Sequence, residues 1–137
     1  MKERVIALGF FDGVHLGHGA LLRRAAEEAA LRGCTPAVFT FDRPPKEVVT
    51  GVPCPLINSP EDRRDLVRRL YRIQDVLMVP FDREMMTTPW DDFIVRILVG
   101  RYHAVHLVAG HDHHFGHRNQ GTPELLAQKC AQLGLGC

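Results

Sequence analysis

Two histidines, His15 and His18, stand three residues apart in a glycine-rich segment near the N-terminus, Gly-Phe-Phe-Asp-Gly-Val-His-Leu-Gly-His. An apolar run at residues 5–8 precedes the segment, and a run rich in alanine, leucine, glutamate and arginine follows it. We interpret the segment as a turn from a buried strand into a helix. Backbone N–H groups at such a turn, with the positive end of the helix dipole behind them, bind phosphate. The spacing places both imidazoles near one side of the first helical turn, where they could stabilise charge on nucleotide phosphates.

The segment differs from the two commoner phosphate-binding turns. It lacks the Gly-Lys-Ser/Thr ending of the Walker motif and the Gly-x-Gly-x-x-Gly pattern of dinucleotide-binding turns. Its His-x-Gly-His string resembles the signature of the nucleotidyltransferase superfamily, whose members transfer a nucleoside monophosphate from ATP or CTP to a phosphate or carboxylate acceptor. The longer string from Gly9 to His18 is similar to the opening motif of the bacterial FAD synthetases. These are the FMN adenylyltransferase modules of the bifunctional riboflavin kinase/FMN adenylyltransferase enzymes.

Composition limits the class of protein. The chain has 137 residues, of which 45% are hydrophobic and 24% are charged, and these values fit one globular domain. A net charge of +1 favours neither nucleic acid nor a membrane as a partner. The apolar runs are too short to span a bilayer, and the N-terminus has no signal-peptide pattern. The four cysteines form no Cys-x-x-Cys pair, so we interpret them as free thiols in the cytoplasm.

Strand and helix patterns alternate along the chain and predict a doubly wound α/β domain with a parallel sheet, a Rossmann-like fold of the nucleotidyltransferase type. The predicted strands cover residues 5–8, 37–41, 76–79 and 105–109. The predicted helices cover residues 16–32, 60–71, 89–99 and 123–133, and the first, third and fourth end at Gly33, Gly100 and Gly134. The last three helices are expected to start at Ser59, Thr88 and Thr122, each of which precedes a proline.

Side-chain periodicity predicts which helix faces are buried. The expected buried stripe of helix 16–32 is Leu21, Leu22, Ala25, Ala26, Ala29 and Ala30. The expected apolar face of helix 89–99 is Phe93, Ile94, Ile97 and Leu98, with Trp90 as a packing anchor. We interpret the arginines near helix 60–71 as a solvated face, paired in part with Glu61, Asp62 and Asp65; they are Arg63, Arg64, Arg68, Arg69 and Arg72.

The loop after the second strand belongs to the edge where ligands bind in parallel sheets. The segment from Thr40 to Pro45 resembles the Thr-Phe-Asp-Pro-His-Pro loop of the family, which helps to hold the flavin. The resemblance implies flavin-binding roles for Phe41, Arg43 and Pro44. Arg43 stands where the family has its first proline, and Pro44 stands where it has histidine.

The loop after the fourth strand resembles a second family motif, Gly-x-Asp/Asn-x-x-Phe-Gly. Gly110, Asp112, Phe115 and Gly116 fit this pattern. The resemblance implies that Asp112 contacts the nucleotide and that Phe115 contacts the flavin. His114 stands where an arginine is frequent, so a titratable group replaces a fixed positive charge.

The resemblance implies the reaction ATP + FMN → FAD + pyrophosphate, with ATP and FMN as small-molecule substrates. His15 and His18 are the expected catalytic residues, which donate hydrogen bonds to the ATP phosphates as pyrophosphate leaves. The expected ATP-binding residues are Gly9, Phe10, Phe11, Asp12, Gly13, His15, Gly17, His18 and Asp112. Mg²⁺ is expected to bridge the triphosphate, and no protein ligand is assigned to it.

Three alternatives stay open at this point. The chain could be a nucleotidyltransferase with another acceptor, such as phosphopantetheine, nicotinate mononucleotide or glycerol phosphate. It could instead be a flavin- or nucleotide-binding module without catalytic activity. A histidine-rich loop could also bind zinc or nickel, through His111, His113, His114 and His117.

The family's adenylyltransferase module continues beyond the part that this chain resembles. It enters another strand and a Ser-Ser-Thr-x-x-Arg motif, whereas this chain ends at Cys137, where that strand should begin. We expect the riboflavin kinase domain to be absent as well. We therefore expect residues 1–137 to form one nucleotidyltransferase domain that is incomplete at its C-terminus, and the oligomeric state is left open.

Overall fold

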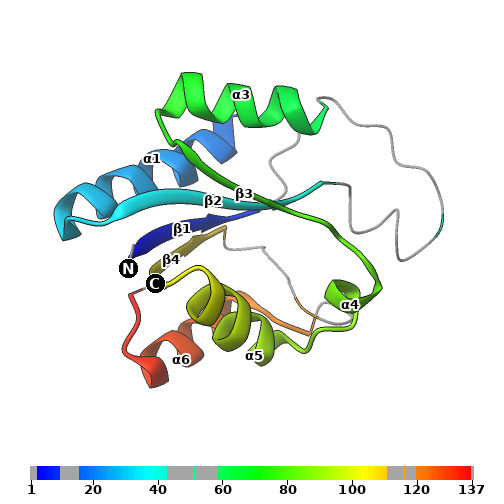
Figure 1. Cartoon of the computed structure of the whole chain (residues 1–137). Helices are drawn as coiled ribbons and strands as arrows, with labels where there is room; N and C mark the ends of the chain where they lie inside the picture. The colour runs from blue at the N-terminus through cyan, green and yellow to red at the C-terminus, as the bar shows by residue number, and fades with distance from the viewer. Residues whose placement is uncertain are drawn as a thin grey trace.

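The described part of the chain contains a parallel β-sheet (Figure 1). The computed structural model describes residues 3–9, 16–42, 51, 59–110, 116 and 120–136, with residues 16–18 described by their backbone alone. The strands are Arg4–Leu8 (β1), Thr35–Phe41 (β2), Asp75–Val79 (β3) and Ala104–Ala109 (β4). Their spatial order is β3-β2-β1-β4, and every neighbouring pair is parallel. The predicted fold class is confirmed.

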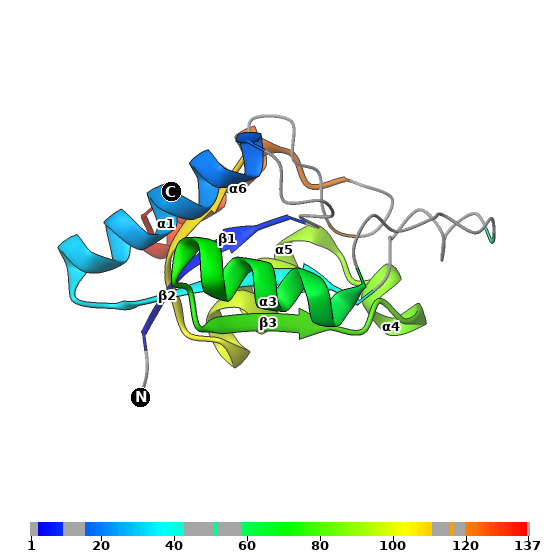
Figure 2. The same ribbon diagram turned by 90° about the horizontal axis from the view of Figure 1, so that it is seen from above.

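Helices cover both faces of the sheet (Figures 1 and 2). Leu16–Arg32 (α1) and Pro60–Tyr71 (α3) lie over one face. The other face carries Arg83–Met86 (α4), Trp90–Asp92 (α5), a π-helix at Phe93–Arg101 (η1) and Pro123–Leu133 (α6). Parallel pairing requires each connection to return from the end of one strand to the start of the next. The crossovers that do so are α1, α3 and the segment from α4 to η1, whereas α6 follows β4.

The two faces of the sheet bury separate hydrophobic clusters. On the η1 side, Ile6, Leu8 and Phe39 pack against the π-helix, and the Phe39 and Phe93 rings meet edge to face with centroids 5.4 Å apart. On the α1 side, Val5 and Val38 belong to a cluster with side chains of α1 and α3. Alternate residues of one strand thus enter opposite clusters, as expected for a parallel strand that is covered on both faces.

Helix boundaries agree with the capping signals at three helices. The Ser59 Oγ accepts a hydrogen bond from the Asp62 N–H at 3.1 Å at the start of α3. The Thr122 Oγ1 accepts one from the Leu125 N–H at 3.2 Å at the start of α6. Gly33 follows α1 with φ 66°, and Gly134 follows α6 with φ 74°. The predicted limits of α1, α3 and α6 are therefore confirmed.

The third predicted helix, 89–99, was wrong in its limits and its type. Thr88 does not cap it, because its hydroxyl donates a hydrogen bond at 2.8 Å to the carbonyl of Glu84, which belongs to the unpredicted helical turn α4. After α5 the backbone widens into η1, where the Tyr102 N–H bonds the Ile97 carbonyl five residues earlier. Gly100 lies inside η1, and the chain turns away at His103 with φ 57°. The predicted apolar face is buried: Phe93, Ile94, Ile97 and Leu98.

The predicted stripe of α1 was too wide. Leu22, Ala25 and Ala29 are buried. Leu21 and Ala26 are half-buried, whereas Ala30 is exposed. The small side chains on the buried stripe allow α1 to lie close to β1 and β2.

One arginine of α3 contradicts the prediction of a solvated face. Arg63 is 1% exposed and packs between α3 and the sheet. It lies one turn before the buried Val67, so both residues share the helix face that packs on β2. Arg69 does form the predicted exposed ion pair with Asp65, at 3.0 Å. Five arginines close together predict an exposed basic face, and the sequence does not show that one of them is buried in the core.

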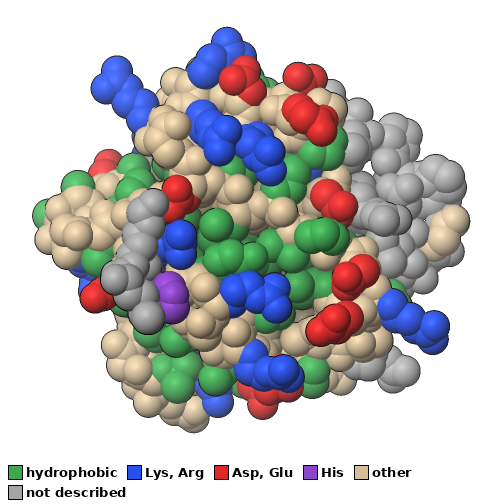
Figure 3. Space-filling model, viewed as in Figure 1, with side chains coloured by type: hydrophobic (Ala, Val, Ile, Leu, Met, Phe, Trp, Pro, Cys, Tyr) green, Lys and Arg blue, Asp and Glu red, His purple; other side chains and the backbone are tan. Residues whose placement is uncertain are grey.

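Charges of both signs are distributed over the face of the molecule seen in Figure 3. Basic and acidic side chains surround a hydrophobic area in the middle of this face (Figure 3). Exposed pairs such as Arg32–Glu28 contribute little to stability, because water and salt screen them. This face therefore carries no large field of a single sign.

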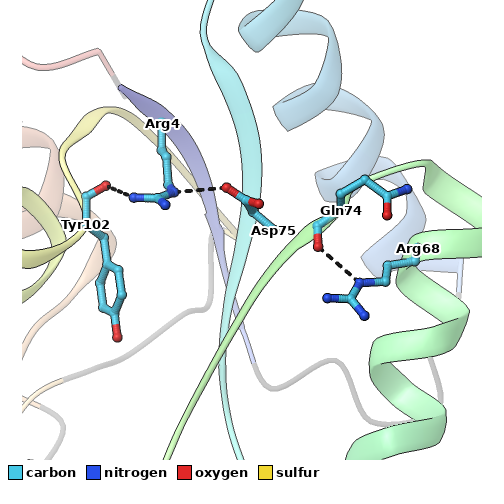
Figure 4. A network of polar contacts seen from close by, with 5 residues as sticks. All are labelled: Arg4, Arg68, Gln74, Asp75 and Tyr102. Carbon is cyan, nitrogen blue, oxygen red and sulfur yellow. Dashed lines mark hydrogen bonds and ion pairs between the residues drawn. The ribbon is translucent and has the colours of Figure 1, made fainter. Parts of the chain in front are cut away.

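A polar network closes the amino edge of the sheet, which we define as the edge where the strands begin (Figure 4). The Arg4 Nε lies 3.1 Å from the Asp75 Oδ2, and the Arg4 Nη1 donates to the Tyr102 carbonyl at 2.9 Å. Arg4 belongs to β1 and Asp75 to β3, so the ion pair reaches past β2. The partly buried guanidinium thus joins β1 to β3 and to the segment that follows η1.

A buried histidine lies near the last described residues. His106 of β4 is 4% exposed, and Gly136 forms a parallel bridge with it. A Cβ at Gly136 would collide with the imidazole and crowd the Arg32 guanidinium, so only glycine fits there. Burial lowers the pKa of His106 below its ordinary value of 6.5, and the charge of Arg32 lowers it further, against an opposing effect of Glu28.

We predict that Arg4→Met lowers the free energy of unfolding by about 1–3 kcal/mol, because it removes a charged partner from the partly buried Asp75. Urea denaturation measures this change. The control is Arg69→Met, which breaks an exposed pair and should cost no more than about 0.5 kcal/mol. Equal losses in the two variants would contradict the structural role of the Arg4 network.

We also predict a pH dependence of stability from His106. Its pKa is lowered in the folded state, so the unfolded chain binds the proton more readily. The stabilisation is complete above the ordinary pKa of 6.5 and is lost as the pH falls through the lowered value. Unfolding free energies at about pH 7.5 and about pH 5.5 should differ less in His106→Leu than in the unaltered chain.

His103→Asn serves as the control for the loss of an imidazole, because asparagine tolerates the positive φ at this position. In this control the unfolding free energy should fall between the two pH values by as much as in the unaltered chain. An unchanged pH dependence in His106→Leu would show that the buried imidazole does not cause it.

Candidate functional site

The carboxyl ends of the four described strands meet at one edge of the sheet, which we call the carboxyl edge. The strands end there at Leu8, Phe41, Val79 and Ala109. The helices α1 and α3 begin at this same edge, because each leads back to the start of a parallel strand (Figure 2). Their N-terminal N–H groups bring partial positive charge to the carboxyl edge.

The strand order reverses between β1 and β4. From β1 the chain passes to β2 and then β3 on one side, and it returns to β4 on the other side of β1. The crossover α1 lies on one face of the sheet, and the connection from β3 to β4 lies on the other (Figure 1). A crevice forms at such a reversal because neighbouring connections leave in opposite directions. The structure therefore places its candidate ligand site outside the ends of β1 and β4.

Gly9 lies at this reversal. It is the first residue after β1, and its N–H donates a hydrogen bond to the Phe39 carbonyl of β2 at 3.3 Å. This bond holds the start of the predicted phosphate-binding turn against the sheet. Leu16 then opens α1, so the turn lies between a strand end and a helix start, as predicted.

Phe41 lies at the end of β2, one strand away from the reversal. Its ring meets the rings of Phe39 and Phe81 edge to face, with centroids 5.5 Å and 4.8 Å away. Phe41 is half-buried and packs against the hydrophobic cluster at the last position of β2. Its flavin-binding role stays a prediction.

Asp42 was not among the predicted site residues, yet it organises the carboxyl edge. Its Oδ1 accepts a hydrogen bond from the Phe81 N–H at 3.1 Å, and its own N–H donates to the Val79 carbonyl at 3.1 Å. These bonds continue the contact between β2 and β3 by one residue past the last paired residues, Phe41 and Val79. An aspartate directly after a strand is the sequence signal for such a turn-forming contact.

Gly116 brings the loop after β4 onto the start of α5. Its φ is 78°, and a Cβ there would lie 2.6 Å from the Trp90 Cα. Only glycine fits this close contact. Trp90 is half-buried against the hydrophobic cluster, which confirms its predicted role as a packing anchor.

Most predicted site residues lie outside the described part of the chain: Phe10, Phe11, Asp12, Gly13, His15, Arg43, Pro44, Asp112 and Phe115. Gly17 and His18 belong to the first turn of α1, but their side chains are outside it too. The histidine cluster at His111, His113, His114 and His117 is also outside. Within the ranges that the structure describes, no three metal-binding side chains come together.

A cavity of about 130 Å³ lies away from the reversal, between α4 and η1. Glu84, Thr88 and Arg101 line it together with the end of β3. Ligand pockets usually enclose several hundred Å³, so a nucleotide or a flavin does not fit here. In the described part of the chain no helix is long and apolar enough to cross a bilayer.

Comparisons with known proteins agree with this geometry. A family model described as FAD synthetase matches residues 1–137. The bifunctional riboflavin kinase/FMN adenylyltransferase of Listeria monocytogenes is 33% identical over 128 residues, which cover 92% of this chain and 40% of that protein. The protein with the same description from Bacillus subtilis is 34% identical over 126 residues, covering 90% and 39%. The chain thus spans about two fifths of the length of these relatives.

The fold has a counterpart among solved structures. A crystal structure described as a macrolide-efflux protein from Streptococcus pneumoniae matches with a TM-score of 0.79 at 26% identity. The match covers 93% of this chain and 42% of that chain. Together with the family match over the whole sequence and the parallel sheet with its reversed strand order, these findings show that the chain belongs to the FAD synthetase family.

Proposed function

We propose that this chain transfers AMP from ATP to FMN, which gives FAD and pyrophosphate. The family match over residues 1–137 supports this reaction class. The single observation that carries the proposal is the place of Gly9 and of the first turn of α1. Gly9 follows β1 directly, and the backbone of Gly17 and His18 belongs to the start of α1, at the reversal of strand order. A nucleotide triphosphate bound there would meet backbone N–H groups at the positive end of a helix.

The proposed chemistry is a displacement at the α-phosphorus of ATP. A phosphate oxygen of FMN forms a bond to the α-phosphorus, while the bond to the bridging oxygen between the α- and β-phosphates breaks. Pyrophosphate leaves with the electron pair of that bond. The FMN phosphate is already anionic, so the reaction needs no general base, and catalysis consists of positioning and charge stabilisation.

We assign His15 and His18 to charge stabilisation of the ATP phosphates, with Gly9, Gly17 and Asp112 on the nucleotide side. Phe41 and Phe115 are assigned to the flavin side, with Arg43 and Pro44. The strand order supports this division, since β1 and β4 flank the reversal and β2 lies one strand away. The two substrates would therefore occupy neighbouring parts of the carboxyl edge.

Mg²⁺ is proposed to arrive with ATP. The described residues contain no group of three side chains that could hold a metal by themselves. Mg²⁺ commonly keeps several waters and binds substrate phosphates through their oxygens, so it needs no dedicated protein cage. When bound, it would neutralise charge on the triphosphate.

The proposed location of this reaction is the cytoplasm. Cys34 is a free thiol, and Cys130 is buried in the core. Free thiols persist in a reducing compartment. FMN and ATP, the proposed substrates, are small molecules, and the proposal requires neither nucleic acid nor a membrane.

The test is incubation of the chain with ATP, FMN and Mg²⁺, followed by chromatography. We expect FAD and pyrophosphate in equal amounts. Phosphopantetheine, nicotinate mononucleotide and glycerol phosphate, offered in place of FMN, should give no adenylylated product. Transfer to one of these acceptors without formation of FAD would contradict the proposal.

His18→Ala should lower the turnover by about 100-fold, the scale of losing one charge-stabilising donor, and leave the thermal unfolding temperature nearly unchanged. His103→Asn is the control, because His103 lies at the amino edge, directly before β4. It should keep full turnover. Equal turnover in His18→Ala and the unaltered chain would remove the catalytic assignment.

A further inference from the structure

Arg63 is a buried charged residue that the proposed chemistry does not use. It lies in the first turn of α3 and is 1% exposed. Its Nη1 donates a hydrogen bond to the Thr40 Oγ1 at 3.2 Å. Among the described residues it belongs to the largest fully buried side chains. A guanidinium therefore lies buried between the sheet and α3, on the face of the sheet that α1 and α3 cover.

A hydrocarbon side chain would suit this place on packing grounds alone. Val67 lies one turn further along α3, on the same helix face, and belongs to the cluster that contains Val38 of β2. Thr40 points to the same side of β2 as Val38, because side chains of a strand alternate. Replacing a buried ionic group by a hydrocarbon of similar volume is often neutral or stabilising. The arginine therefore needs an explanation other than packing.

The position of Thr40 explains why an arginine occupies this buried place. Thr40 is 1% exposed and is the second-last residue of β2, directly before Phe41. The backbone of Val79 and Phe81 holds Asp42 through two hydrogen bonds. The Phe81 ring packs edge to face against the Phe41 ring. Arg63 adds a contact from α3, on the face opposite the phenylalanine rings. The end of β2 is thus held from both faces and from its neighbouring strand.

Arginine suits this task because its planar guanidinium donates in fixed directions from a preorganised fork. A change in the Thr40 backbone angles would turn the peptide that leads into Phe41 and would also move the hydroxyl away from the Arg63 guanidinium. Arg63 therefore limits the orientations available to the end of β2, where the proposed flavin side begins.

We propose that Arg63 is a positioning residue for FMN. It acts through Thr40 to fix the end of β2, from which Phe41 approaches the flavin. This inference rests on the proposed function. It further implies that the effect is larger for the acceptor than for the nucleotide. Thr40 directly precedes Phe41 on the flavin side, whereas the nucleotide side lies at the reversal between β1 and β4.

The experiment measures two affinities in the 137-residue chain. Quenching of flavin fluorescence reports the Kd for FMN, and calorimetry reports the Kd for the α,β-methylene analogue of ATP with Mg²⁺. We expect Arg63→Met to raise the Kd for FMN about tenfold, the scale of one hydrogen bond to a charged group, and to leave the Kd for the analogue within about twofold. Arg63→Lys, which keeps a donor but loses the fork, should recover part of the FMN affinity.

Thr40→Val removes the acceptor without changing the side-chain shape. It should weaken FMN binding to the same extent as Arg63→Met, and the double variant should be no weaker than either single variant. Arg69→Met, an exposed arginine of the same helix, is the matched control and should keep both affinities. If Arg63→Met fails to fold, Thr40→Val alone decides the question by its FMN affinity.

The outcomes separate this inference from the proposed function. An unaltered chain that binds no FMN contradicts the proposed function, and the inference falls with it. An unaltered chain that binds FMN, beside an Arg63→Met variant of equal affinity, contradicts the inference alone. Equal weakening of FMN and the ATP analogue would also overturn it, since that result indicates a general loss of structure.

Discussion

The parallel pairing of β1 with both of its neighbours is the constraint on which the rest of the structure depends. Val5, Ile6, Ala7 and Leu8 are almost completely buried, because β1 lies between β2 and β4 and between two helical layers. Parallel pairing forces every connection to return across the sheet, so each strand ends at the same edge. The reversal of strand order on the two sides of β1 then opens that edge for a ligand.

The two edges of the sheet are built differently. At the amino edge, the guanidinium of Arg4 ties β1 to β3 and to the segment after η1 (Figure 4). At the carboxyl edge, Asp42 and Arg63 hold the end of β2, while Gly9 leaves β1 directly into the motif segment. The amino edge is thus held by a charged side chain, whereas the carboxyl edge leads into the glycine-rich motif segment. Binding residues in α/β proteins are generally found on such loops above a rigid scaffold.

Sequence reasoning predicted the elements whose ends carry their own chemistry. The limits of α1, α3 and α6 are marked by Ser59, Thr122 and terminal glycines, and the structure confirms them. The predictions were wrong where tertiary contacts determine the limits of a helix. The Thr88 hydroxyl bonds a carbonyl of α4 in place of capping the next helix, and the segment after α5 forms a π-helix. At the site, Gly9 and Phe41 stand at the predicted strand ends, whereas most other predicted site residues lie outside the described part. Arg63 was misread because the burial of one arginine among five depends on where α3 lies on the sheet.

The measurement that tests the central claim most directly is the change in backbone amide NMR shifts when the α,β-methylene analogue of ATP is added with Mg²⁺. A nucleotide bound at the reversal of strand order should shift the amides of Gly9, Gly110 and the first turn of α1. It should leave the amides of Arg4 and Asp75 at the amino edge unchanged. Shifts concentrated at the amino edge, or around the cavity between α4 and η1, would contradict the account.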